Sequence, residues 1–279
     1  MSRSAFTSAA ARAAHLVVDC PPVIFADTLA SALLGDRAEE LIDYHRRHGD
    51  HPVLAGARAQ TVVRGRFAED LLARAGFGQY VLLGAGLDSF AYRSPLAGSV
   101  CVFEVDAAAT QAAKRAALAA AGIAAPSTVS FVAADLAVDP VHERLCEHGF
   151  DPAEPALVAW LGVVTYLDAA AIDQTLAAVA GFAPETTLVF DHLLPAGLRD
   201  ADGDAYVTQV APATAEWGEP WRTFLAPHEA AALLARHGFG GVTHHDQRSA
   251  LPAELWHRTD ALRPARLSVL TTATVSGHG

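Results

Sequence analysis

The chain has 279 residues, of which 52% are hydrophobic, and this is enough apolar side chain for the core of one large α/β unit. Its net charge of −11 leaves no basic face for phosphate backbones, so we expect no nucleic-acid partner. The sequence shows no apolar run of about 18 residues and no signal-peptide core, so we expect a cytoplasmic protein without a membrane partner.

The first 79 residues predict helices, including 9–18, 38–48 and 60–74, with the segment PPVIFADTLASALLG between the first two. These helices are too apolar to stand alone in water. We therefore expect residues 1–79 to form an N-terminal helical cap that packs on a sheet or covers its carboxyl edge.

From residue 80 onward, strand-like and helix-like patterns alternate, which is typical of a parallel sheet wrapped by helices. Residues 80–279 are expected to form this core, with a long irregular, lid-like loop at about 195–220, where Gly, Pro and Asp are frequent. The predicted helices are 107–122, 169–182 and 227–237. The predicted strands are 80–84, 100–105, 129–133, 156–161, 187–191, 242–245 and 266–275.

The turn after the first predicted strand is rich in glycine and predicts a close ligand. Gly84 and Gly86 carry no Cβ and tolerate positive φ, so a ligand can approach the backbone there. Glu104 and Asp106 end the next predicted strand about 20 residues later, the spacing at which nucleotide-binding α/β folds place an acid on ribose hydroxyls. The two strand ends therefore point to one nucleoside.

Other clusters of polar residues do not predict a metal site. His45, His48 and His51 are separated by Gly49 and Pro52, which break the helix that would align them. The acidic run that begins at Asp200 lacks the glycine and the last glutamate of a calcium loop. The three cysteines lack CxxC spacing, so we expect reduced, buried thiols.

Taken together, these segments resemble the leucine carboxyl methyltransferase-like branch of class I S-adenosylmethionine (SAM)-dependent methyltransferases, which includes bacterial polyketide O-methyltransferases. The resemblance spans nearly the whole chain and implies a Rossmann-like, seven-stranded, mostly parallel sheet with helices on both faces. It rests on RGRFAEDLL from Arg64, VLLGAGLDSFAYR from Val81, VFEVDAAATQAAKRAAL from Val102, VAADL from Val132, PALVAWLGVVTYL from Pro155, GEPWRTFLAPHEAAALLARHGF from Gly218 and HRTDALRP from His257.

The resemblance implies SAM as cofactor and assigns residues to each part of it. Arg64 would pair with the methionyl carboxylate, as a planar guanidinium is suited to do, with Arg66 as the less favoured partner. Asp106 would hold the ribose, with Glu104 as the alternative. The remaining implied contacts are Gly84, Ala85, Gly86 and Asp88 at the methionine part, Asp135 and Leu136 at the adenine, and Trp160 beside the cofactor. Leu161 departs from many family members, which have a glutamate there.

The expected reaction is methyl transfer to an oxygen of a small organic acceptor, a carboxyl or phenol such as a polyketide. In-line alignment and exclusion of water would supply most of the catalysis. A phenol would also need a base, for which His192 is the best-placed candidate. Residues proposed for the acceptor pocket are Tyr166, Tyr206, Trp217 and Arg222.

Three other interpretations stay open. An NAD-dependent oxidoreductase would share the start of the glycine motif, although Ser89 stands where its third glycine belongs. A SAM-binding protein that no longer transfers methyl groups, or a non-enzymatic interaction module, is also compatible with the fold. The sequence leaves the oligomeric state open, including a homo-oligomer.

Overall fold

The computed structural model describes residues 2–277. Over that range the chain forms a seven-stranded sheet in the order β3-β2-β1-β4-β5-β7-β6. The first five strands of that order are parallel, and β7 runs antiparallel between β5 and β6. The strands are β1 (Gln79–Leu83), β2 (Cys101–Asp106), β3 (Val129–Ala133), β4 (Ala156–Trp160), β5 (Thr187–Leu193), β6 (Phe239–Asp246) and β7 (Ser268–Val275).

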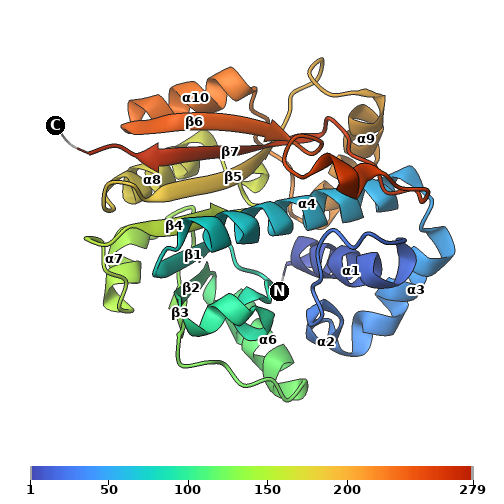
Figure 1. Ribbon diagram of the computed structural model, residues 1–279, viewed down its shortest axis with the longest axis horizontal. Helices are drawn as coiled ribbons and strands as arrows, with labels where there is room; N and C mark the ends of the chain where they lie inside the picture. Colours follow the sequence, from blue (N-terminus) through green and yellow to red (C-terminus); the bar gives the residue numbers. More distant parts are fainter. Residues whose placement is uncertain (1, 278–279) are drawn as a thin grey trace.

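Helices cover both faces of this sheet, which confirms the predicted Rossmann-like α/β fold (Figure 1). Four helices precede β1, namely α1 (Arg3–Val18), α2 (Ala30–Leu33), α3 (Ala38–His48) and α4 (Pro52–Ala75). The others are α5 (Phe90–Arg93), α6 (Ala108–Ala120), α7 (Val141–Glu147), α8 (Ala169–Ala180), α9 (Ala201–Glu216) and α10 (Pro227–Arg236).

The central strands are apolar on both sides because each of their faces is covered by a separate core. In β1, Val81 and Leu83 pack with α7, α8 and α10, whereas Tyr80 and Leu82 pack with α4 and α5. Successive side chains of a strand point to opposite faces, so one continuous apolar run supplies both cores. This explains why the strands were predicted correctly to within a few residues.

Helix α4 joins the N-terminal helices to the sheet. It begins earlier than the predicted residue 60 because Pro52 occupies its first turn and the His51 side chain accepts the N–H of Val53. Its Val62, Val63 and Phe67 are buried in the same core as β1. Helix α4 therefore packs on the sheet, whereas α1, α2 and α3 share a separate core with Leu87 and with Leu118 of α6. The division at residue 79 stays a prediction, and its outer limits, residues 1 and 279, lie outside the described residues.

The predicted irregular loop at 195–220 is wrong, because helix α9 fills most of it. The Asp200 carboxylate caps this helix by accepting the N–H of Gly203 at 2.8 Å. Gly203 looks like a helix breaker in the sequence. In the fold it allows a close approach, since a Cβ there would lie 2.6 Å from the carbonyl oxygen of Arg266. Tertiary contact therefore explains the glycine that obscured the helix.

Two smaller expectations also need correction. Cys20 and Cys101 are exposed, not buried, because one lies in the loop after α1 and the other begins β2 at the amino edge of the sheet. Strand β6 begins at Phe239, three residues before the predicted strand, and a register irregularity between Gly240 and Thr243 accommodates the glycines.

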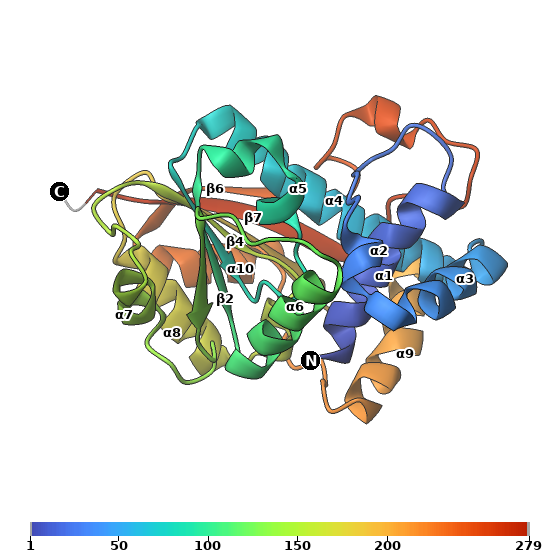
Figure 2. The ribbon, with the colours of Figure 1, turned by 90° about the horizontal axis from the view of Figure 1, so that it is seen from below.

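The carboxyl ends of the parallel strands all face one end of the molecule. In Figures 1 and 2, helices α1, α3 and α9 gather beyond this end, and α7 and α8 lie away from it. Within the described residues, no helix is both long and apolar enough to cross a bilayer.

Candidate active site

The glycine-rich turn follows β1 at the carboxyl edge and takes a shape that only glycine accepts easily. Gly84 and Gly86 have φ of 73° and 46°. The N–H groups of Gly84 and Ala85 both donate to the carbonyl of Val105, at 2.8 and 3.0 Å. A Cβ on Gly84 would lie 2.4 Å from Cγ2 of Val163, so the loop after β4 packs directly on this turn.

Asp106 ends β2 beside the turn, with its carboxylate held by backbone groups. Oδ2 accepts the N–H of Gly86 at 2.7 Å, and Oδ1 accepts the N–H of Ala107 at 2.8 Å. Burial raises the pKa of Asp106, although these two hydrogen bonds oppose the shift. Each carboxylate oxygen can accept a further hydrogen bond, so a pair of ligand hydroxyls would fit this acid.

Glu104, the alternative acid, lies in a different environment. It is 1% exposed, and Oε2 lies 2.7 Å from Nζ of Lys114, which is equally buried on α6. Burial raises the pKa of Glu104, and the Lys114 ammonium opposes that rise. Glu104 is therefore engaged in a buried ion pair with Lys114, and Asp106 is the acid that lies at the glycine-rich turn.

Arg64 reaches the same edge from α4 and lies on the backbone after β4. A Cβ on Gly162 would lie 2.5 Å from Nη1 and 2.6 Å from both Cζ and Nη2 of Arg64, so the guanidinium covers this glycine. Arg64 Nη2 donates to Ser8 of α1 at 2.9 Å. Nη1 lies 3.5 Å from Oδ2 of Asp191, whose other oxygen accepts the N–H of Gly162.

Contacts connect Arg64 with the glycine-rich turn. Arg64 lies on Gly162, the next residue Val163 packs against Gly84, and Asp106 accepts the N–H of Gly86 in the same turn. Helix α1 closes this region from outside, because Ala5 lies 3.4 Å from the position of a Cβ on Gly86. The edge therefore presents a guanidinium at one end and a carboxylate at the other. This is the complementary charge pattern for a ligand that carries an acid at one end and hydroxyls at the other.

Arg66 and Asp88 have local partners. Nε of Arg66 donates to both carboxylate oxygens of Asp70, at 2.8 and 2.7 Å. The Asp88 carboxylate accepts the N–H of Phe90 at 2.8 Å and so orients the end of the glycine-rich turn. Arg66 thus forms an ion pair on the surface of α4. This is compatible with its lower rank than Arg64 as a partner for the methionyl carboxylate.

The residues predicted near the adenine are divided between the surface and the core. Asp135 is exposed and accepts the N–H of Ala137 at 2.9 Å, whereas Leu136 is 7% exposed. Trp160 is fully buried in the core of the sheet, with its ring centroid 6.1 Å from that of Phe190.

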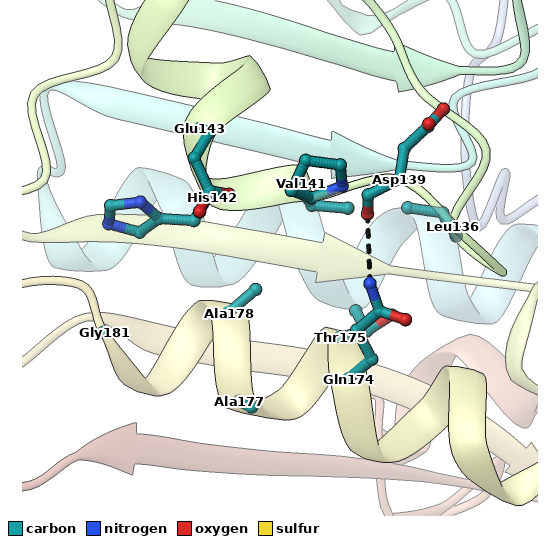
Figure 3. Close-up of a pocket in the computed structure, with 11 residues that line it drawn as sticks. Leu136, Asp139, Val141, His142, Glu143, Gln174, Thr175, Ala177, Ala178 and Gly181 are labelled. Atoms are coloured by element: carbon teal, nitrogen blue, oxygen red, sulfur yellow. Dashed lines mark hydrogen bonds between the residues drawn. The ribbon is translucent and has the colours of Figure 1, made fainter.

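A groove of about 370 Å³ separates α7 from α8 and includes Leu136 in its lining. Figure 3 shows that the Gln174 amide crosses it to the carbonyl of Asp139, at 3.4 Å. The glycine-rich turn, Asp106 and Arg64 are not among its lining residues, so we do not place the chemistry in this groove.

His192 is 1% exposed, and both of its ring nitrogens have partners. Nδ1 lies 2.9 Å from the carbonyl of Leu225, and Nε2 lies 3.0 Å from the hydroxyl of Thr271. Burial lowers the pKa of His192 to about 4, so the ring is neutral. A neutral imidazole donates through one nitrogen and accepts through the other. The Nδ1–H of His192 therefore donates a hydrogen bond to the Leu225 carbonyl, and the Thr271 hydroxyl donates to Nε2. The predicted role of His192 as a base has no geometric support here.

Of the predicted pocket residues, Tyr206 is affected by both Tyr166 and Arg64. Burial raises the pKa of Tyr206 on α9, the Tyr166 hydroxyl raises it further, and the Arg64 guanidinium lowers it. The Tyr206 hydroxyl therefore lies within electrostatic range of both the Tyr166 hydroxyl and the Arg64 guanidinium. Trp217 ends α9 beneath the Arg3 guanidinium, and the backbone of Arg222 donates to Thr165.

Ser8, Gly162 and Asp191 were not predicted as site residues, although the structure groups all three around Arg64. The sequence signal for Asp191 was its place near the end of a predicted strand, next to His192. The alternation of side chains along a strand could have assigned these two neighbours to different faces. Asp191 faces Arg64 at the site, and His192 faces the opposite side of the sheet.

Comparisons with known proteins bear on the family and the fold of this chain. The sequence profile of the leucine carboxyl methyltransferase family matches residues 5–180. Two relatives named as S-adenosyl-L-methionine-dependent methyltransferases are each 35% identical, one from Mycolicibacterium smegmatis over 57% of this chain and one from a Parafrankia species over 71%. The matches span 51% and 65% of those relatives' own lengths.

Among solved structures, a Thermobifida fusca protein described as a methyltransferase is similar in fold. The TM-score is 0.61 at 20% sequence identity, over 88% of this chain and 93% of that one. At this level of identity the likeness supports the fold.

Proposed function

Since the chain belongs to the leucine carboxyl methyltransferase family, we propose that it is a SAM-dependent methyltransferase acting on an oxygen of a small organic acceptor. One observation carries the proposal. Asp106 lies at the glycine-rich turn, and Arg64 lies at the opposite end of the same edge of the sheet.

Each end of the edge has a role in this proposal. The cofactor supplies an electrophilic methyl group on a positively charged sulfur. Asp106 would accept from the ribose hydroxyls, Arg64 would hold the amino-acid carboxylate, and Asp135 with Leu136 would lie at the adenine. The backbone of the glycine-rich turn would line the methionine part, and α1 would keep water away from it.

The acceptor would enter on the side of Tyr166 and Tyr206. The Tyr206 phenol lies within electrostatic range of both Tyr166 and Arg64, which supports a pocket for a polar, oxygen-bearing group. A carboxylate acceptor needs no base, because its oxygen is already charged at neutral pH. This fits a site in which His192 has no free nitrogen.

A thermal-shift experiment tests the cofactor. SAM and S-adenosylhomocysteine should raise the melting temperature, since a ligand stabilises the state that it binds, and NAD should not. A shift with NAD alone would favour the oxidoreductase interpretation and contradict ours.

Replacing Asp106 by Ala should abolish the shift with S-adenosylhomocysteine, because the ribose loses its acceptor. Asp173→Ala, at an exposed acid on α8, is the matched control and should keep the full shift. An unchanged shift in the Asp106 variant would remove the ribose contact from the proposal.

Incubation with methyl-labelled SAM and a panel of organic carboxylic acids and phenols tests the reaction. Label should appear in an oxygen-linked methyl of at least one acceptor. Cofactor binding without transfer to any acceptor would favour a SAM-binding protein that does not methylate.

A further inference from the structure

The Asp191 carboxylate is almost entirely buried, at 5% exposure, and lies on β5 beside the site. A buried charge is costly unless other groups compensate it. Its two oxygens divide between a backbone group and a side chain. Oδ1 accepts the N–H of Gly162, and Oδ2 lies 3.5 Å from Nη1 of Arg64.

Arg64 is therefore oriented from two sides. Ser8 accepts from Nη2 at 2.9 Å, Asp191 faces Nη1, and the guanidinium plane lies against Gly162. A guanidinium has five N–H donors, and the contacts with Ser8 and Asp191 use two of them. The other donors are left for a ligand carboxylate.

Asp191 also acts on the loop that carries Gly162. This residue has φ of 72° and precedes Val163, whose Cγ2 packs against Gly84. The Asp191 carboxylate thus orients both the Arg64 guanidinium and the loop against which this guanidinium lies.

We propose that Asp191 is a positioning residue that holds Arg64 for the carboxylate of the cofactor. This inference rests on the proposed function, because it assumes that Arg64 binds the amino-acid end of SAM. Asp191 touches neither end of the cofactor in this account and acts only through Arg64 and Gly162.

Two ligands separate this role from a general loss of structure. S-adenosylhomocysteine carries the amino-acid end, whereas 5′-methylthioadenosine has the same nucleoside without it. By calorimetric titration, Asp191→Asn should weaken binding of S-adenosylhomocysteine about tenfold or more and leave that of 5′-methylthioadenosine unchanged. The asparagine keeps an oxygen for the Gly162 N–H, so this variant should fold even where Asp191→Ala does not.

A double-mutant cycle adds a second test. In an Arg64→Ala background, Asp191→Asn should cause no further loss of affinity for S-adenosylhomocysteine, since the two residues act as one unit. Asp173→Asn, on the surface of α8, is the matched control and should change neither ligand's affinity.

Three results would overturn the inference: equal weakening of both ligands, additive losses in the double variant, or unchanged or tighter binding of S-adenosylhomocysteine by Asp191→Asn. Failure of the proposed function looks different, because the unmodified protein would then bind neither ligand.

Discussion

At the scale of single residues, Glu104 and Asp106 show how neighbouring acids acquire different roles. Both lie on β2, but only Glu104 is fully buried with Lys114. Replacing Glu104 by Gln leaves the Lys114 ammonium buried without a counter-charge. We expect a loss of about 3–5 kcal/mol in the free energy of unfolding, measured by urea denaturation.

The double variant Glu104→Gln, Lys114→Met removes both charges and should lose less stability than Glu104→Gln alone. Asp106→Asn should lose much less, because backbone N–H groups and not a buried cation are its partners. Equal stability of Glu104→Gln and the unmodified protein would show that the ion pair contributes little.

At the scale of elements, α9 depends on its first turn. The Asp200 carboxylate accepts the N–H of Gly203 and also the N–H of Arg266, both at 2.8 Å. Asp200→Ala removes the helix cap and a link to the segment before β7. We expect a loss of about 1–2 kcal/mol by urea denaturation, with faster hydrogen exchange in 201–216.

Asp202→Ala is the matched control on the same helix. Its carboxylate pairs with Arg263 at the surface, where ion pairs contribute little, so stability should hardly change. Equal effects of the two substitutions would argue that capping does not determine the start of α9.

At the scale of the whole molecule, buried neutral histidines make stability depend on pH. Burial lowers the pKa of His192 to about 4, against 6.5 as the ordinary value. The unfolded chain therefore binds the proton first, and stability falls as the pH decreases from about 6.5 toward 4. Burial raises the pKa of Glu69 to about 7, which opposes this trend, because that group costs stability as the pH rises.

A comparison of two proteins isolates the histidine. Between pH 7.5 and pH 4.5, the unmodified protein should lose about 2–3 kcal/mol more stability than His192→Asn, by urea denaturation at each pH. Only the difference between the two pH values matters, so a constant loss in the variant does not affect the result. Parallel pH profiles would show that His192 titrates normally in the fold.

Much of the fold followed from local patterns. Strands β1 and β4 are short, continuous apolar runs because both faces of a central parallel strand are buried. Helix α9 could not be predicted in the same way. Its glycine and its proline suggested a loop, and only the contact of Gly203 with the Arg266 carbonyl explains the glycine.

The sequence by itself determined the α/β architecture, the glycine-rich turn and the acids that follow it, because periodicity, backbone freedom and strand ends depend on neighbours in the chain. Only the tertiary structure decided that Glu104 pairs with Lys114, that His192 is enclosed by Leu225 and Thr271, and that Asp191 faces Arg64. Burial and pairing depend on contacts between segments as far apart in the chain as α4 and β5. Local sequence patterns do not determine which distant segments come into contact.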